Sequence, residues 1–369
     1  MPTRRARRIS PGVDTVLVPR TVPLLLCVLL GACVGQTSTA SPSPATSAPT
    51  AGAAPSASAG ATPRTVRPFE RVLALAGPAE ASHVAVDRER VAFVEGTSVT
   101  IVEAATGQKR DVHQATPGWN VSLSPRGLRG DVLVLTETRT DGQRTDGRAI
   151  RVDLRTSARA TLDEWSGPYL GGGDTLTADP PITNGTDVVW TRITADVQPF
   201  AVELVLARGT AVPVVVSRST SAAWADLHDD GRVAISVFIT RGDQADLAVW
   251  QDGQVTRVGT RGIPDGGPAR FMGDRLFWAL GPGFVARIDR GQLITLGGAI
   301  QDVAFPGCAW SGASVRHLAL GCGNAASWTL LDPATGTRGD AIPAFQLIAG
   351  PRAVAWREGA QWWLGMLPP

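Results

Sequence analysis

The sequence is poor in the side chains that most often carry out catalysis or bind metals. Its 369 residues include four histidines, four cysteines, one tyrosine and a single lysine, Lys109. None of the histidines lies in a G-x-S-x-G or H-E-x-x-H setting. Acidic residues are scattered at expected turns, which leaves open a carboxylate pair for sugar hydrolysis but identifies none. The sequence therefore singles out no catalytic residue and no cofactor, and whether the chain is an enzyme stays open.

An excess of positive charge is also missing once the N-terminus is set aside. The chain has 35 basic and 33 acidic residues, but five of the arginines and only one acidic residue fall in the first 32 positions. The remainder has 30 basic and 32 acidic residues, a net charge of −2. Proteins that bind nucleic acids usually carry a basic surface patch. We therefore expect no nucleic-acid partner.

No apolar run is long enough to span a membrane permanently. Arg20 and Pro23 limit the apolar stretch near the N-terminus to Val22–Leu30, whereas a transmembrane helix needs about 20 apolar residues. Basic residues before this short run, and small residues after it, are typical of a secretory signal peptide. We expect residues 1–32 to be that signal, so the rest of the chain is extracytoplasmic.

The residues at the end of this run, Leu30-Gly31-Ala32-Cys33, resemble the lipobox of bacterial lipoproteins. The resemblance implies cleavage before Cys33 and attachment of a diacyl group (palmitate, for example) to its sulfur. Two acyl chains suffice for stable anchoring. The expected location is then the cell envelope, on the outer side of the cytoplasmic membrane or on the outer membrane. The alternative is an ordinary signal peptide in which Cys33 occurs by chance.

Aromatic residues are absent from a segment that follows. From Gln36 to Arg64 the chain consists almost entirely of Ser, Thr, Ala, Pro and Gly. Such a composition cannot bury enough apolar surface to offset the entropy of ordering, so residues 33–64 should form a disordered, lipidated linker. Its 29 residues from Gln36 on would span about 30 Å. Residues 65–369 then form the folded domain.

Helical periodicity is missing throughout residues 65–369, and short strands of alternating apolar residues recur instead. Seven copies of one strand pattern begin at positions spaced 36 to 56 residues apart. These first positions are Val91, Val132, Val188, Val233, Leu276, Leu318 and Val354. Large apolar residues at a shared place in each copy are expected to pack between neighbouring units: Phe93, Val134, Trp190, Ile235, Trp278, Leu320 and Trp356.

A repeat of about 40–45 residues with several strands resembles a β-propeller, although no subfamily signature is present. The resemblance implies an all-β fold with seven four-stranded blades, six or eight being the alternatives. The last unit ends one strand short, and Phe69–Ala76 before the first unit can supply that strand. We therefore expect an N-terminal strand to close the ring.

Only Cys308 and Cys322 remain in the folded domain, and in an exported protein they favour a disulfide over a metal pair with His317. Asp226, Asp229 and Asp230 precede Gly231. These carboxylates could suggest calcium, but Asp-Asp-Gly is also typical of a tight hairpin turn. We favour the turn and predict no metal site.

The leading functional hypothesis is a monomeric binding or assembly module for an unknown protein or glycan, anchored to the membrane by its lipid. The alternatives are a propeller hydrolase or lyase that acts on surface glycans, and a small-ligand sensor. Three long loops between second and third strands (Arg139–Arg148, Arg192–Phe200 and Thr240–Asp246) and one insertion between blades (Asp163–Pro180) should share one face. The candidate partner-binding residues on them are Arg144, Trp165, Tyr169, Arg192 and Arg241. Functionally neutral insertions are the competing interpretation.

Overall fold

The computed structural model describes residues 65–142, 144–168, 180–194, 202–219, 223–239, 244–259, 263–264, 266–280, 288–323 and 327–368. These residues form β-strands, turns and irregular segments, with no helix among them. In the part of the chain that is described, no helix is long and apolar enough to cross a membrane. The predicted signal peptide, linker and Cys33 lie outside the described residues.

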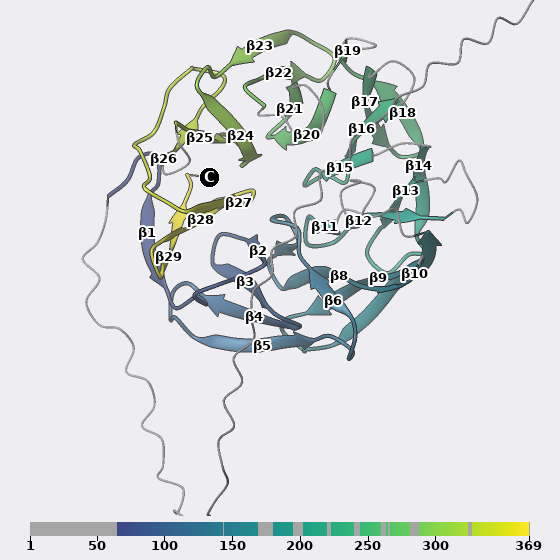
Figure 1. The fold of residues 1–369 in the computed structure, drawn as a ribbon. Helices are drawn as coiled ribbons and strands as arrows, with labels where there is room; N and C mark the ends of the chain where they lie inside the picture. The colour runs from purple at the N-terminus through teal and green to yellow at the C-terminus, as the bar shows by residue number, and fades with distance from the viewer. Residues whose placement is uncertain are drawn as a thin grey trace, which may run out of the picture. The chain divides into compact units, whose positions relative to one another are not determined.

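The strands form seven antiparallel sheets arranged as a ring, so the fold is a β-propeller with seven blades (Figure 1). Blade 1 contains β2 (His83–Val86), β3 (Arg90–Glu95), β4 (Ser98–Glu103) and β5 (Lys109–Gln114). Blade 2 contains β6 (Asn120–Ser122), β7 (Leu128–Arg129), β8 (Val132–Asp141), β9 (Arg144–Asp153) and β10 (Arg159–Pro168). Blade 3 contains β11 (Ile182–Thr183), β12 (Val188–Ile193), β13 (Val202–Ala207) and β14 (Val214–Ser219).

The remaining four blades follow the same order, from an innermost first strand to an outermost last strand. Blade 4 contains β15 (Ala223–Leu227), β16 (Val233–Ile239), β17 (Gln244–Gln251), β18 (Gln254–Arg257) and the short β19 (Ile263–Pro264). Blade 5 contains β20 (Gly266–Met272), β21 (Arg275–Leu280), β22 (Arg290–Thr295) and β23 (Ile300–Ala304). Blade 6 contains β24 (Cys308–Ala313), β25 (Leu318–Cys322) and β26 (Ser327–Leu331), whose outer partner is a segment joined by the bridges Trp328–Ile342 and Leu331–Arg338.

The last blade confirms the predicted ring closure. Blade 7 contains β27 (Gln346–Ala349), β28 (Ala353–Glu358) and β29 (Gln361–Met366), and its outermost strand is β1 (Arg71–Leu75) from the N-terminal side. Strand β1 pairs with β29 from Arg71–Met366 to Leu75–Trp362, and the two lie side by side in Figure 1. Strand β1 thus covers the outer edge of β29, which would otherwise be unpaired where the chain ends the ring.

The predicted core positions on the second strands are confirmed. Phe93, Trp278 and Trp356 are fully buried, and the other four are at most 3% exposed. Neighbouring blades meet through such residues: Phe93 of blade 1 contacts Trp362 of blade 7 edge to face, with ring centroids 5.0 Å apart. Phe69, just before β1, stacks on Trp356 at 5.3 Å. Apolar contacts between blades therefore hold the ring together, as the repeat pattern predicted.

Connections between strands emerge on two sides of the ring, because successive strands alternate in direction. We call the side with the turns between first and second strands the turn face; Asn184–Asp187 and His228–Arg232 are two of these turns. We call the opposite side, which holds the connections between second and third strands and between blades, the loop face. Asn184-Gly185-Thr186 forms a hairpin turn, in which Gly185 has a φ of 100° and the Asn184 side chain accepts hydrogen bonds from two backbone N–H groups.

Two predicted loops are wrong in extent. Arg139–Arg148 is not a long loop, because β8 continues to Asp141 and β9 begins at Arg144, with the two residues paired. Likewise, Asp163–Pro168 belongs to strand β10, so the insertion between blades begins later than expected. The turn at Pro306–Gly307, between β23 and β24, is a further connection between blades on the loop face.

The predicted disulfide between Cys308 and Cys322 is present. The two residues are directly opposite each other on β24 and β25, with Cα atoms 4.0 Å apart. The bond therefore joins the first two strands of blade 6.

Candidate functional site: the centre of the ring

The innermost strand of blade 2 is interrupted, and the residues between its halves enter the centre of the ring. Strands β6 and β7 both pair with β8 and are separated by Leu123–Gly127, which we call the inward segment. Pro125 has no N–H for a strand ladder, which favours an interruption there. Gly127 approaches the neighbouring strand so closely that a Cβ would lie 2.8 Å from the Val134 carbonyl oxygen. The sequence Leu-Ser-Pro-Arg-Gly therefore suits a local departure from the strand.

The backbone of the inward segment is fastened to the two adjacent blades. The Val86 N–H of blade 1 donates to the Pro125 carbonyl at 3.0 Å, and the Thr183 N–H of blade 3 donates to the Arg126 carbonyl at 3.1 Å. Within blade 2, the Val134 N–H donates to the Gly127 carbonyl at 2.7 Å. These bonds fix the direction in which the Arg126 side chain leaves the segment.

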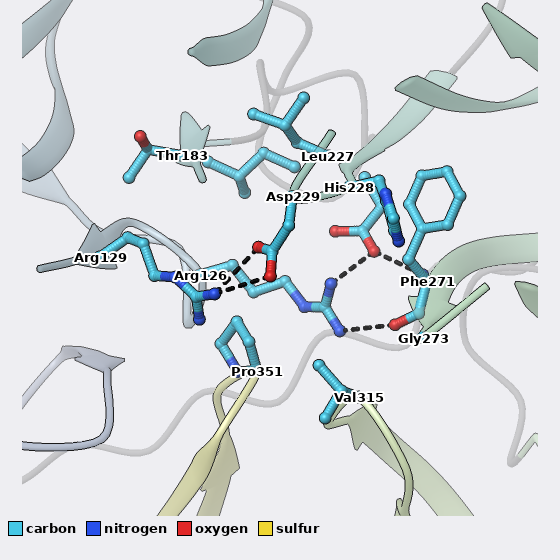
Figure 2. Close-up of a pocket in the computed structure, with 12 residues that line it drawn as sticks. Arg126, Arg129, Thr183, Leu227, His228, Asp229, Phe271, Gly273, Val315 and Pro351 are labelled. Carbon is cyan, nitrogen blue, oxygen red and sulfur yellow. Dashed lines mark hydrogen bonds and ion pairs between the residues drawn. The ribbon is translucent and has the colours of Figure 1, made fainter. Parts of the chain in front are cut away.

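The Arg126 side chain crosses the centre and contacts three further blades; Figure 2 shows its bonds to blades 4 and 5. Its Nη1 donates to Asp226 Oδ2 of blade 4 at 2.5 Å. Its Nη2 donates to the carbonyl oxygens of Phe271 in blade 5 and Ala313 in blade 6, at 3.2 and 2.9 Å. Asp226 Oδ2 also accepts the Phe271 N–H at 2.6 Å. The inward segment and its arginine thus connect blades 1 to 6.

Both members of this ion pair are buried. Asp226 is fully buried and Arg126 is 7% exposed. Burial lowers the pKa of Arg126, and the negative charge of Asp226 opposes that change. A buried ion pair adds little net stability, but loss of one partner leaves an uncompensated charge in the interior. Substitution of either residue alone should therefore destabilise the protein strongly, although the intact pair adds little to its stability.

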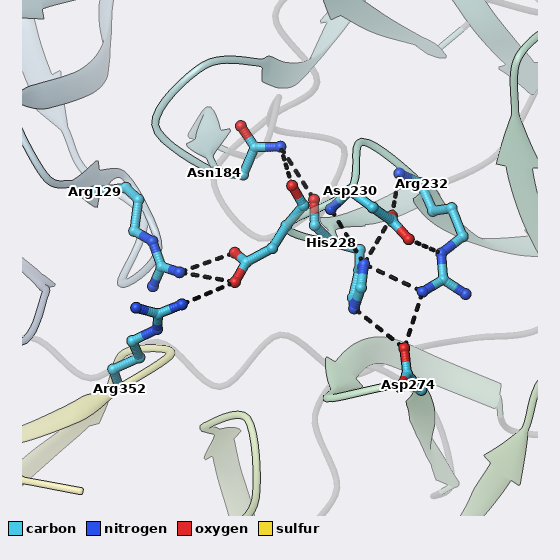
Figure 3. Close-up of polar contacts among 8 residues, drawn as sticks. Arg129, Asn184, His228, Asp230, Arg232, Asp274 and Arg352 are labelled. Atoms are coloured by element: carbon cyan, nitrogen blue, oxygen red, sulfur yellow. Dashed lines mark hydrogen bonds and ion pairs between the residues drawn. The ribbon is translucent and has the colours of Figure 1, made fainter. Parts of the chain in front are cut away.

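On the turn face, a second set of charges covers this centre (Figure 3). Asp229 of blade 4 accepts hydrogen bonds from Arg129 of blade 2 at 2.9 Å and from Arg352 of blade 7 at 3.1 Å. The Asn184 side chain donates to the His228 carbonyl oxygen at 3.1 Å. The cavity between this layer and Arg126 measures about 60 Å³. It holds no more than a few water molecules, since one water needs about 10–15 Å³.

Beside this layer, a smaller charged group joins blades 4 and 5. His228 Nδ1 lies 2.7 Å from Asp230, and Arg232 contacts both Asp230 at 2.7 Å and Asp274 at 3.3 Å. Partial burial opposes ionisation of Asp230, but hydrogen bonds from Arg232 and His228 outweigh it and lower the pKa of Asp230 to about 2. Within the described residues, no group of three or more His, Cys, Asp or Glu side chains could hold a metal ion. Asp229 and Asp230 are turn residues, whereas Asp226 lies in β15.

On the loop face, the described residues leave a cavity at the centre. This cavity of about 330 Å³, which we call the ring-mouth cavity, lies above the inward segment. Strand β11 has only two residues and pairs with Val188 and Val189, so it does not extend beside Trp190 and Thr191 of β12, which line the cavity. The described residues that line it are His83, Leu123, Ser124, Pro125, Pro180, Ile182, Val189, Trp190, Thr191, Trp224, Ala225, Pro268 and Arg270. It is large enough for a small molecule, whereas the cavity on the turn face is not.

The structure places three of the five predicted partner-binding residues, all on blades 2 and 3. Arg144 begins β9 and its Nη2 donates to Ser166 at 3.0 Å. Trp165 of β10 is opposite Gly147 of β9. Arg192 of β12 is held by two carboxylates, Asp163 at 2.8 Å and Glu203 at 2.9 Å. Tyr169 and Arg241 lie outside the described residues. Whether the five bind a partner stays a prediction.

Trp119, which directly precedes β6, contacts two arginines at the same end of blade 2. The guanidinium groups of Arg139 and Arg148 lie 5.1 and 4.6 Å from its ring centroid. Arg148 also contacts Glu137, which is 1% exposed and lies 2.6 Å from His113 Nε2. Trp119 is therefore part of a fixed polar and aromatic cluster between blades 1 and 2.

Sequence reasoning did not find Arg126, Arg270 or the ring-mouth cavity. Arg126 bonds to residues 100 to 187 positions away, so no local pattern records those contacts. The one usable signal is the run Ser-Pro-Arg-Gly at residues 124–127, because proline and glycine disfavour a central strand.

Comparisons with known proteins identify the fold but no family. The sequence matches no protein-family model and no curated protein. The structure is similar to the β-propeller domain of the Trilobed protease from Pyrococcus furiosus, with a TM-score of 0.52 and 11% identity over 77% of this chain and 89% of that chain.

Two further similar structures are acylaminoacyl peptidases. The Pyrococcus horikoshii enzyme has a TM-score of 0.50 and 11% identity, over 75% of this chain and 48% of that chain. An acylaminoacyl peptidase in complex with a chloromethyl ketone has a TM-score of 0.51 and 12% identity, over 78% and 52%. The chain thus spans about half the length of these peptidases, and at such identities the likeness shows the propeller fold alone.

Proposed function

We propose that the chain is a lipid-anchored, extracytoplasmic binding module that binds its partner or ligand on the loop face. The observation that carries this proposal is the asymmetry of the ring centre. The inward segment and Arg126 block it, charged residues cover it on the turn face, and a cavity of about 330 Å³ opens on the loop face. Concave sites that are mostly apolar with a few polar groups are typical of ligand binding.

A hydrolase or lyase that acts on surface glycans is the alternative suggested by the sequence. Most glycoside hydrolases use a pair of Asp or Glu side chains beside the scissile bond. No Asp or Glu is among the described residues that line the ring-mouth cavity. The cavity lining therefore favours binding over sugar hydrolysis.

The anchor part of the proposal rests on the lipobox-like residues before Cys33. Wild-type protein should incorporate labelled palmitate and enter the detergent phase in a phase-partition assay. Cys33→Ala should lose the label, whereas Cys27→Ala, within the expected signal, should keep it. Unlabelled wild-type protein in the aqueous phase would contradict the anchor.

The loop-face part is tested by shortening residues 169–179 to a Gly-Ser turn. This change leaves Asp163 in place, and with it the bonds to Arg192 and Trp190. We expect the melting temperature to stay near that of the wild type, and capture of the envelope partner by the full chain to be lost. Thr186→Arg on the turn face is the matched control and should preserve capture. Loss of capture with the control alone would place the binding surface on the turn face.

A further inference from the structure

The ring-mouth cavity contains a positive charge without an opposite charge beside it. Arg270 of β20 is half-buried in its wall, and its Nη1 donates to the carbonyl oxygens of Ala225 and Ala269 at 3.1 and 3.0 Å. Its Nε and Nη2 make no hydrogen bond to a described residue, and no described carboxylate lies within ion-pair distance. The carboxylate of Asp226 is paired with Arg126 through Oδ2, which also accepts the Phe271 N–H, and no ion pair joins it to Arg270.

The other described lining residues do not compensate this charge. None of them is acidic, and Arg270 is the one side chain among them that is charged at neutral pH, because burial lowers the pKa of His83. Desolvating a charge without a partner is costly, so a cavity with this lining favours an anion. The planar guanidinium with free N–H groups on one edge is suited to a carboxylate.

The rest of the lining is apolar and partly aromatic. Leu123, Ile182, Val189 and Trp190 are buried beside the cavity, and the half-buried Trp224 also lines it. Proline rings at Pro180 and Pro268 complete the apolar wall. At about 330 Å³ the cavity is at the lower end of the roughly 300–1,000 Å³ usual for small-molecule sites. Its occupant must therefore be small, with an apolar or aromatic body.

We propose that the ring-mouth cavity binds a carboxylate attached to an apolar ring, with Arg270 holding the carboxylate and Trp224 contacting the ring. This inference rests on the proposed function and adds the chemical class of the ligand. The same chemistry is present in a free aromatic acid and in the C-terminal residue of a peptide that ends in an aromatic side chain.

The test measures the binding of matched acid and amide probes to the full chain in detergent by titration calorimetry. The free-acid pair is 1-naphthylacetate and 1-naphthylacetamide; the peptide pair is acetyl-Ala-Ala-Phe with a free or an amidated C-terminus. We expect at least one acid to bind about tenfold or more tightly than its amide, as a charge-assisted hydrogen bond implies. Which acid binds more tightly distinguishes a free ligand from a peptide end.

Two variants assign the effect to the cavity. Arg270→Gln should weaken binding of the acid about tenfold or more and leave that of the amide unchanged. Arg270→Lys retains the charge, so it should weaken the acid less, and it serves if Arg270→Gln fails to fold. Arg110→Gln, at an exposed position on the outer strand of blade 1, is the control and should bind both probes as the wild type does.

Three results would overturn the inference: equal affinity for acid and amide, full affinity for the acid in folded Arg270→Gln, or no binding of any probe. None of them would remove the loop face as the binding surface, because that claim is tested by partner capture without a small probe. Conversely, capture of the partner on the turn face would contradict the proposed function but would not change the result of the probe titration.

Discussion

Replacing Arg126 with methionine should destabilise the entire ring. Methionine can replace the aliphatic part of the arginine side chain but has no guanidinium group, so Asp226 would remain buried without its cation. The carbonyl oxygens of Phe271 and Ala313 would also lose their donor. Breaking a buried ion pair by removing one partner typically costs about 3–5 kcal/mol. For a domain of this size, at about 2 °C per kcal/mol, the melting temperature should fall by roughly 6–10 °C.

The explanation can be separated from a simple loss of packing by a second substitution. Asp226→Asn removes the charge that Arg126→Met leaves unpaired, and its amide oxygen can still accept the Phe271 N–H. The double variant should therefore be more stable than Arg126→Met alone, by about 2 kcal/mol, although Asp226→Asn by itself destabilises the wild type.

The assay is thermal and urea unfolding of all four proteins, followed by far-ultraviolet circular dichroism. Arg110→Met, at an exposed position on β5, is the matched control and should change stability by no more than about 0.5 kcal/mol. The reasoning is refuted if Arg126→Met costs less than about 1 kcal/mol, or if Asp226→Asn further destabilises it.

Three other predictions follow from the ring. Deleting residues 69–76 should abolish or severely weaken folding, because it removes β1 and the Phe69 ring that stacks on Trp356. Deleting residues 36–62 should leave the melting temperature unchanged. Equal melting temperatures of the two deletion variants would contradict the closure. Cys308→Ser/Cys322→Ser should lower the free energy of unfolding by roughly 3 kcal/mol, the estimate for a loop of about 15 residues, and non-reduced peptide mass analysis should find the pair linked in wild-type protein; two free thiols would contradict it. Burial lowers the pKa of His83, His113 and His317; in His113 it outweighs the opposing hydrogen bond to Glu137. The folded state therefore binds fewer protons than the unfolded state just below pH 6.5. The free energy of unfolding should therefore decrease as the pH falls from 6.5 towards 5. In urea titrations, His113→Gln should reduce this dependence on pH. A pH dependence unchanged by the substitution would exclude His113 as a contributor.

The sequence predicted the parts of the fold that depend on local patterns. Val-Ala-Phe-Val after Arg90 is a short apolar run that is buried throughout in β3, and similar runs return at a propeller spacing, so the blades, their core positions and the closing strand were accessible. The end of β8 and the start of β9 were predicted as a loop because Thr138–Arg148 is polar. Both strands are nevertheless paired there through backbone bonds, which hydropathy does not record.

The centre of the ring could not be predicted in the same way. Arg126 is one of 34 arginines, and nothing in its neighbourhood shows that its partners come from blades 4, 5 and 6. Asp226 was grouped with Asp229 and Asp230 by proximity in sequence, yet one is buried in a strand and the others are in a turn. The ring-mouth cavity depends on the shortness of β11, which follows residues that carry no strand pattern.

The most direct test of the loop face as the binding surface uses two positions at opposite ends of one strand. Thr194 follows β12 on the loop face and Thr186 precedes it on the turn face, and both are exposed. A photoreactive benzoylphenylalanine at each position, in separate full-length proteins in intact cells, should form a cross-linked adduct from position 194 and none from position 186. An adduct from position 186 with none from position 194 would contradict the account.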